Sequence, residues 1–208
     1  RSDCALVSAG YRLSPEHPFP ASLDDAHAAF HWMVGHADEL GLDPSRVVIG
    51  GESAGGGLAA SLVQRLIDEG TPIAGQLLVY PMLDDRTAAR PDIGRKDHLA
   101  WNNASNRYGW SSFLGGPVGS ATTPEYAVPA RRADLSGLPP AWIGVGDLDL
   151  FLDEDTTYAD RLRGAGVEVE FLLVQGAPHA FVTLEPSAPA STSFFDSAGA
   201  FARRLLHD

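Results

Sequence analysis

Ser53 lies in a sequence context that could make it a nucleophile. It is flanked by Gly51 and Gly55 in the stretch VVIGGESAGG, residues 47–56, where an apolar β-branched run meets a helical pattern. A G-x-S-x-G motif between a strand and a helix predicts a tight turn that presents the serine hydroxyl at the carboxyl end of the strand. We expect glycine at both flanking positions because such a turn leaves no room for side chains there.

Ala54 follows the serine at the expected N-terminus of the helix. Its backbone N–H could donate a hydrogen bond to a developing oxyanion. The alternative interpretation is a glycine-rich turn in which Ser53 only caps the helix. The two interpretations differ in one requirement, because a nucleophilic serine needs a general base nearby.

An acid and a histidine follow two later expected strands. Asp149 comes after residues 141–145, within GDLD, and His179 comes after residues 167–174, within GAPHAF. Because the carboxyl ends of parallel strands lie along one edge of a sheet, Ser53, Asp149 and His179 should meet there. His179 would take the serine proton, and Asp149 would fix the tautomer of the imidazole ring.

Both assignments have structural alternatives. His179 could be an ordinary loop histidine in a turn rich in Gly and Pro. Asp147, Asp153 and Asp155 are close to Asp149 in the chain, and any of these acids could cap the helix that follows. We favour Asp149 as the acid, with Asp153 next.

The elements that must position these residues alternate between strand and helix. The patterns predict strands at 4–9, 47–50, 76–80, 141–145 and 167–174, and helices at 22–40, 54–69, 155–165 and 191–206. Ser22 and Asp25 resemble a capping box at the start of the first helix, and Gly41 should end it. The alternation predicts an α/β fold with a mostly parallel sheet and flanking helices. We interpret residues 1–208 as a single, partial domain with an insertion at about 83–139.

Composition narrows the class of partner. The formal net charge of −12 argues against nucleic acid and anionic membranes. No apolar run approaches the roughly 20 residues of a membrane-spanning helix. We therefore expect no stable membrane anchor and a cytoplasmic location. Cys4 is the only cysteine, so neither an intrachain disulfide nor a cysteine metal cluster is expected.

Two further patterns receive structural interpretations. Residues 55–60, GGGLAA, fit a dinucleotide-binding pattern but begin inside the helix, too late after the strand. His27 and His31 lie four residues apart on one helix face near Asp24, and we interpret them as solvated polar residues of an amphipathic helix. No metal and no cofactor is therefore expected.

Four segments resemble the hormone-sensitive-lipase-like (family IV) esterases of the α/β-hydrolase fold. Residues 10–21, GYRLSPEHPFPA, are similar to that family's DYRLAPEHPFPA, and residues 51–56 are similar to its G-D/T-S-A-G-G. Residues 146–154 and 176–181 resemble its acid and histidine loops, so the resemblance covers nearly the whole chain. It implies a serine hydrolase that cleaves small-molecule carboxylic esters with short to medium acyl groups. The reaction would proceed through an acyl-enzyme without a cofactor.

The chain also departs from the family pattern. Gly10 stands where the family usually has Asp, and Glu52 stands where it has Asp or Thr. Ala180 stands where the family usually has Gly. These differences bear on substrate preference. The family's H-G-G-G loop, whose backbone N–H groups build most of the oxyanion hole, has no counterpart in residues 1–208. By resemblance, the chain begins at the family's fourth strand and lacks the cap and the first three strands.

The family's third strand normally lies between its fourth and fifth strands. We therefore expect a gap or an unpaired edge between residues 4–9 and 47–50, which a complementing N-terminal segment or a second copy in a homo-oligomer would fill. Two other functions stay open. One is a peptidase or amidase, because the triad does not choose the bond. The other is a non-catalytic fragment or ligand-binding homologue, against which the presence of His179 argues.

Overall fold

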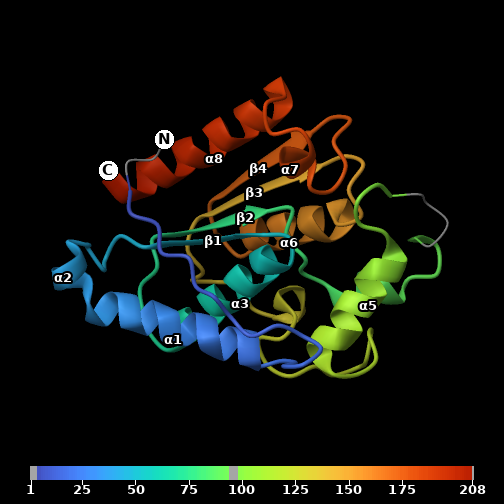
Figure 1. The fold of residues 1–208 in the computed structure, drawn as a ribbon, viewed down its shortest axis with the longest axis horizontal. Helices are drawn as coiled ribbons and strands as arrows, with labels where there is room; N and C mark the ends of the chain where they lie inside the picture. The colour runs from blue at the N-terminus through green and yellow to red at the C-terminus, as the bar shows by residue number, and fades with distance from the viewer. Residues whose placement is uncertain (1–3, 94–97, 208) are drawn as a thin grey trace.

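A four-stranded parallel sheet forms the centre of the computed structural model, which describes residues 4–93 and 98–207 (Figure 1). The strands are β1 (Val48–Glu52), β2 (Gly75–Val79), β3 (Ala141–Gly146) and β4 (Val169–Val174), and they lie side by side in that order. In the register, Gly51 pairs with Leu78 and Leu78 pairs with Ile143. All four carboxyl ends therefore lie along one edge, as the alternation of strands and helices predicts.

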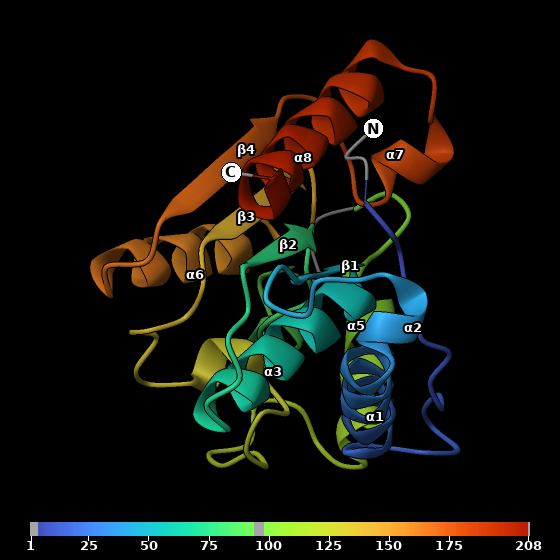
Figure 2. The same ribbon diagram turned by 90° about the vertical axis from the view of Figure 1, so that its left-hand side faces the viewer.

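Helices cover both faces of this sheet (Figures 1 and 2). One face packs against α3 (Ala54–Asp68) and α6 (Leu152–Gly164), with α1 (Ala21–Gly35) against α3, and the other packs against α8 (Pro189–His207). Successive strand residues point to opposite faces. Ile143 thus joins the core beneath α3 and α6, while Trp142 packs against Phe194 of α8. In the described residues no helix is long and apolar enough to cross a bilayer.

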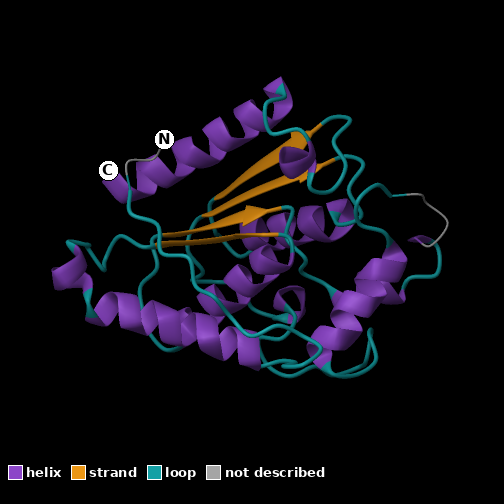
Figure 3. Cartoon of the chain, viewed as in Figure 1, coloured by secondary structure: helices purple, strands orange, loops and turns teal. Residues whose placement is uncertain are grey.

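The segment between β2 and β3 is largely helical and irregular (Figure 3). It contains α4 (Asp85–Ala89), α5 (Asn103–Leu114) and the short 3₁₀ helix η2 (Pro129–Arg131). α5 begins at Asn102, whose side chain accepts hydrogen bonds from two backbone N–H groups of the first turn. Trp110 of α5 shares a core cluster with Phe151, so this segment packs against the loop that follows β3.

The first predicted helix is interrupted at His36. α1 ends at Gly35 and α2 (Ala37–Leu40) follows, because His36 has a non-helical φ of −112°. Gly41, with a φ of 65°, ends α2 as predicted. The predicted capping box is wrong. Asp25 instead accepts hydrogen bonds from the backbone N–H and the Nε of Arg12, both at 2.9 Å.

The strand predicted at residues 4–9 is also wrong. Residues 4–10 have no regular secondary structure, and Leu6 is 89% exposed. A strand is stabilised by hydrogen bonds to a neighbouring strand, not by β-propensity alone. In the part of the chain that the structure describes, β1 pairs with β2 only, so β1 is an edge strand of this sheet.

Candidate active site

Ser53 occupies a strained turn between β1 and α3. Its φ of 55° and ψ of −119° lie outside the regions that L-residues favour, and φ is positive as the G-x-S-x-G motif predicts. Backbone hydrogen bonds hold the turn in place. The N–H of Ser53 donates to the carbonyl of Val79 at 2.9 Å, and the carbonyl of Ser53 accepts from the N–H of Met82 at 3.0 Å. The end of β2 therefore fixes the position of the serine.

The glycines around Ser53 differ in how closely the surrounding backbone approaches them. A Cβ at Gly51 would lie 2.1 Å from the carbonyl oxygen of Gly55, so a side chain cannot fit there. At Gly55 a Cβ would meet nothing within 4 Å, which corrects the expectation that this position is sterically closed. Gly57 is closed as well, because a Cβ there would lie 2.1 Å from the carbonyl oxygen of Met82. The turn thus requires glycine at Gly51, and close packing of α3 on the segment after β2 requires it at Gly57.

The structure brings the histidine and the acid to the serine. His179 Nε2 lies 2.9 Å from Ser53 Oγ, and His179 Nδ1 lies 2.8 Å from Asp149 Oδ2. Both Asp149 and His179 are 4% exposed. The other carboxylate oxygen of Asp149 accepts the backbone N–H of Phe151 at 2.9 Å, which fixes the carboxylate. When Nδ1–H donates to Asp149, Nε2 carries a lone pair that can accept the proton of Ser53.

Aromatic rings surround the imidazole of His179. The ring of Tyr80 lies 4.8 Å from it and that of Phe151 lies 5.1 Å from it, both edge-on. The hydroxyl of Tyr80 donates to Glu52 Oε1 at 2.5 Å, and the Thr183 hydroxyl donates to the same oxygen at 3.3 Å. Burial and the Glu52 carboxylate raise the pKa of Tyr80 above its usual value, so the phenol stays protonated. Sequence reasoning treated Glu52 only as a departure in the motif and missed Tyr80.

The acid loop and the histidine loop are bonded to each other. Asp147 Oδ1 accepts the backbone N–H of Gly176 at 2.6 Å, and the N–H of Leu148 donates to the carbonyl of Ala177 at 3.1 Å. Asp147 therefore positions backbone rather than the imidazole. Asp153, the second candidate for the acid, pairs with Arg90 at 3.0 Å and is largely exposed, so the structure does not place it at His179.

Two buried acids follow at the start of α6. Glu154 Oε1 accepts the N–H groups of Leu83 at 2.7 Å and Asp84 at 3.1 Å, which links α6 to the segment after β2. Desolvation raises the pKa of Glu154 to about 8. Asp155 is fully buried, and desolvation together with the charges of Glu154 and Asp149 raises its pKa well above the usual range. Both side chains are therefore mainly protonated at neutral pH.

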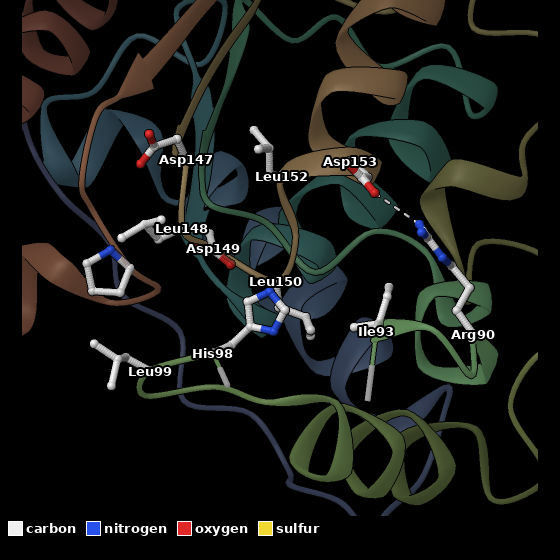
Figure 4. Close-up of a pocket in the computed structure, with 11 residues that line it drawn as sticks. Arg90, Ile93, His98, Leu99, Asp147, Leu148, Asp149, Leu150, Leu152 and Asp153 are labelled. Carbon is white, nitrogen blue, oxygen red and sulfur yellow. Dashed lines mark hydrogen bonds and ion pairs between the residues drawn. The ribbon is translucent and has the colours of Figure 1, made fainter. Parts of the chain in front are cut away.

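A cavity of about 300 Å³ lies against the acid loop (Figure 4). Leu148, Leu150 and Ile93 contribute apolar surface, and His98 faces the same space. Its wall also includes Asp149 and Pro178, the neighbour of His179. The ion pair between Arg90 and Asp153 lies at one end, as Figure 4 shows. A small organic group thus has room beside the loop that carries the acid.

Comparison with known proteins places this chain in a family. A family model described as "alpha/beta hydrolase fold" matches residues 1–183. The esterase LipI of Mycobacterium tuberculosis is 35% identical over 208 residues, which is 99% of this chain and 64% of LipI. The chain therefore spans just under two thirds of the length of this relative.

Solved structures of esterases have the same fold as this chain. The esterase LipW of Mycobacterium marinum superposes with a TM-score of 0.91 at 39% identity, covering 100% of this chain and 65% of LipW. An esterase described as a member of the bacterial hormone-sensitive lipase family superposes with a TM-score of 0.81 at 30% identity, covering 94% of this chain and 64% of that one. The fold is thus the α/β-hydrolase fold. Within it, the chain belongs to the hormone-sensitive-lipase-like esterase family, as the sequence resemblance implies.

Proposed function

We propose that this chain carries the catalytic triad of a carboxylesterase, with Ser53 as nucleophile, His179 as general base and Asp149 as the acid that orients the imidazole. The observation that carries the proposal is the continuous hydrogen-bonded path from Ser53 Oγ through His179 to Asp149, at 2.9 and 2.8 Å. A serine hydroxyl is a poor nucleophile at neutral pH unless a base removes its proton. The strained backbone at Ser53 is a second, independent indication of a functional site.

The proposed reaction proceeds in two halves. Ser53 Oγ attacks the ester carbonyl carbon while its proton passes to His179 Nε2, and the ionised Asp149 stabilises the resulting imidazolium. The C–O bond then breaks, the leaving alkoxide takes the proton from Nε2, and an acyl-enzyme remains on Ser53. Water then attacks the acyl carbonyl carbon while one of its protons passes to His179 Nε2. The bond from that carbon to Ser53 Oγ breaks, Oγ takes the proton from Nε2, and the carboxylic acid leaves. We expect short to medium acyl groups, as in the family.

Ala54 supplies one donor of the proposed oxyanion hole, because its N–H opens α3 immediately after the nucleophile. The loop that supplies the other donors in the family has no counterpart in residues 1–208. Loss of one such donor typically costs about 10²–10³ in kcat. We therefore expect this chain on its own to turn over esters slowly, and a further segment to complete the hole.

We propose that the same segment adds a strand to the free edge of β1. Three features support this: the edge is unpaired within the described residues, the apolar side chain of Leu6 is exposed, and the space beside Gly55 is open. Unpaired strand edges readily pair with other chains. The occupant is a complementing N-terminal segment or a second copy of the chain. Measurement of the mass in solution shows whether a second copy of the chain is bound. A monomer with the full activity of the family would contradict both occupants, the second copy and the complementing segment.

The experiment for the function is a series of p-nitrophenyl esters from acetate to decanoate, with a p-nitroanilide of the same acyl group as the matched control. The proposal expects turnover of the esters, greatest for short and medium chains, and little turnover of the anilide. Preferred cleavage of the anilide would assign the triad to a peptidase or amidase. Binding of esters without any turnover, both alone and with a complementing segment, would indicate a ligand-binding homologue.

A further inference from the structure

Three metal-ligating side chains converge where α1 meets the end of α3. His27 and His31 lie one turn apart on α1, and Glu69 caps the C-terminus of α3. Glu69 Oε2 lies 2.8 Å from His27 Nε2 and 3.8 Å from His31 Nε2, and the two Nε2 atoms are 3.0 Å apart. α1 and α3 pack against each other, as Figure 2 shows. The sequence interpretation placed the two histidines near Asp24 and did not include Glu69.

His27 Nε2 makes two short contacts, and no placement of protons gives each of them its own hydrogen. Each imidazole Nε2 has one in-plane position, which holds either a hydrogen or a lone pair. If His27 Nε2–H donates to Glu69, it has no lone pair left for His31. If His27 Nε2 instead accepts from His31, its lone pair faces the Glu69 carboxylate at 2.8 Å, and two acceptors repel. No tautomer therefore gives each of the two short contacts of His27 Nε2 a hydrogen of its own.

A single cation between the three atoms removes this conflict, because all three can then present a lone pair. Zinc binds histidine nitrogen and carboxylate oxygen at about 2.0–2.2 Å in tetrahedral geometry, which separates neighbouring ligand atoms by about 3.3–3.5 Å. The three observed separations, from 2.8 to 3.8 Å, bracket that spacing. We propose that His27, His31 and Glu69 form a zinc site that joins α1 to the C-terminal end of α3.

Arg65 orients the carboxylate of the third ligand, Glu69. Arg65 Nε donates to Glu69 Oε1 at 3.1 Å, which leaves Oε2 directed at the histidines. The same guanidinium pairs with Asp24 at 2.9 Å, so its positive charge is shared with a second carboxylate.

The site is open to solvent on one side. The side chains of His27, His31 and Glu69 are 18%, 49% and 37% exposed, so an ion can enter without unfolding the helices. Water would fill the fourth coordination position. The site lies at the opposite end of α3 from Ser53, so its effect is structural. Zinc binds the folded arrangement only and stabilises it by mass action.

The test is titration of metal-free protein with Zn²⁺ against a chromophoric chelator, together with thermal unfolding with and without the metal. The variants are His31→Ala and Glu69→Gln. The matched control is His36→Ala, since His36 lies at the C-terminal end of the same helix but outside the cluster. Unfolding without metal shows whether each variant retains the fold. Mg²⁺ serves as a second control, because it prefers all-oxygen octahedral sites.

We expect one Zn²⁺ per chain and a higher Tm with Zn²⁺ but not with Mg²⁺. Each of the two cluster variants should weaken Zn²⁺ affinity by about 100-fold or more, since even outer-shell partners of a metal cost about 10–100-fold. His36→Ala should bind like the parent. Absence of stoichiometric binding, or equal binding by folded His31→Ala and the parent, would overturn the site.

Discussion

The hydroxyl of Tyr80 donates to Glu52, the residue before Ser53, at 2.5 Å, while the ring of Tyr80 lies 4.8 Å from the imidazole of His179. One side chain from the end of β2 thus contacts both the residue before Ser53 and the ring of His179. Neither contact is local in sequence. Tyr80 thus supports the proposed triad from outside the G-x-S-x-G motif.

Tyr80→Phe should keep the ring and lose the hydrogen bond to Glu52. Hydrogen bonds to charged groups contribute about 1.5–3 kcal/mol. Because Glu52 is exposed and also accepts from Thr183, we expect a loss of about 1–2 kcal/mol in the free energy of unfolding, measured by urea denaturation. Tyr108→Phe is the control, since Tyr108 is 66% exposed. Equal effects of the two changes would show that the bond contributes nothing.

Asp149→Asn and Asp153→Asn should separate the two candidate acids. Asp149 orients His179, so its amide variant would favour the wrong tautomer and lower kcat by about 10⁴. Asp153 pairs with Arg90 at the surface, so its variant should retain most activity. The measurement is kcat on a p-nitrophenyl ester under the same conditions for both. If Asp153→Asn were the inactive one, the assignment of the acid would be wrong.

Glu154 should make stability depend on pH. Its pKa is raised from 4.5 in the unfolded chain to about 8 in the folded protein by desolvation. The folded state therefore binds the proton more tightly, and the contribution of this group to stability is full below pH 4.5 and is lost as pH rises toward 8. Glu154→Gln keeps an oxygen for the N–H groups of Leu83 and Asp84 but cannot ionise.

We expect Glu154→Gln to flatten this decline, with a gain over the parent of about 4 kcal/mol between the two ends of that range. Chemical denaturation at a series of pH values measures it. Glu125→Gln, at an exposed site, should leave the profile unchanged. The prediction fails if both variants follow the parent. Asp155, with a pKa raised in the same direction, should add to the slope that remains.

Gly57→Ala and Gly55→Ala should act in opposite directions although both lie in the first turn of α3. A Cβ at Gly57 would collide with the carbonyl of Met82, whereas at Gly55 it would meet nothing within 4 Å. Overpacking typically costs about 1–3 kcal/mol. Alanine in an open helical position gains about 0.5–1 kcal/mol over glycine. Urea unfolding of both variants checks the difference, and a destabilised Gly55→Ala would indicate that a segment closes that space.

The sequence predicted the parts of this protein that depend on local pattern. Ser53, Asp149 and His179 could be placed together because each follows a strand that is readable from its apolar residues, and parallel strands share one edge. The strand at residues 4–9 was predicted wrongly because β-propensity does not form a strand without a neighbour to pair with.

What the sequence could not show depends on partners distant in the chain. The roles of Glu52 and Glu154 arise from contacts with the end of β2 and the segment after it. The local sequence around Glu154 is typical of a solvent-exposed acid in the first turn of a helix. The interpretation of His27 and His31 likewise lacked Glu69, which reaches them from the far end of another helix. Such contacts have no periodic signature, so only the folded arrangement reveals them.

The central claim is that Ser53 is the nucleophile, and covalent trapping with a fluorophosphonate probe tests it most directly because it requires no complete turnover. Peptide mass spectrometry should find the adduct on Ser53. Labelling should be absent in Ser53→Ala and strongly reduced in His179→Ala, and ester hydrolysis by either variant should fall by about 10⁶ in an active form of the protein. An adduct on a different residue, or ester turnover that persists in Ser53→Ala, would contradict the account.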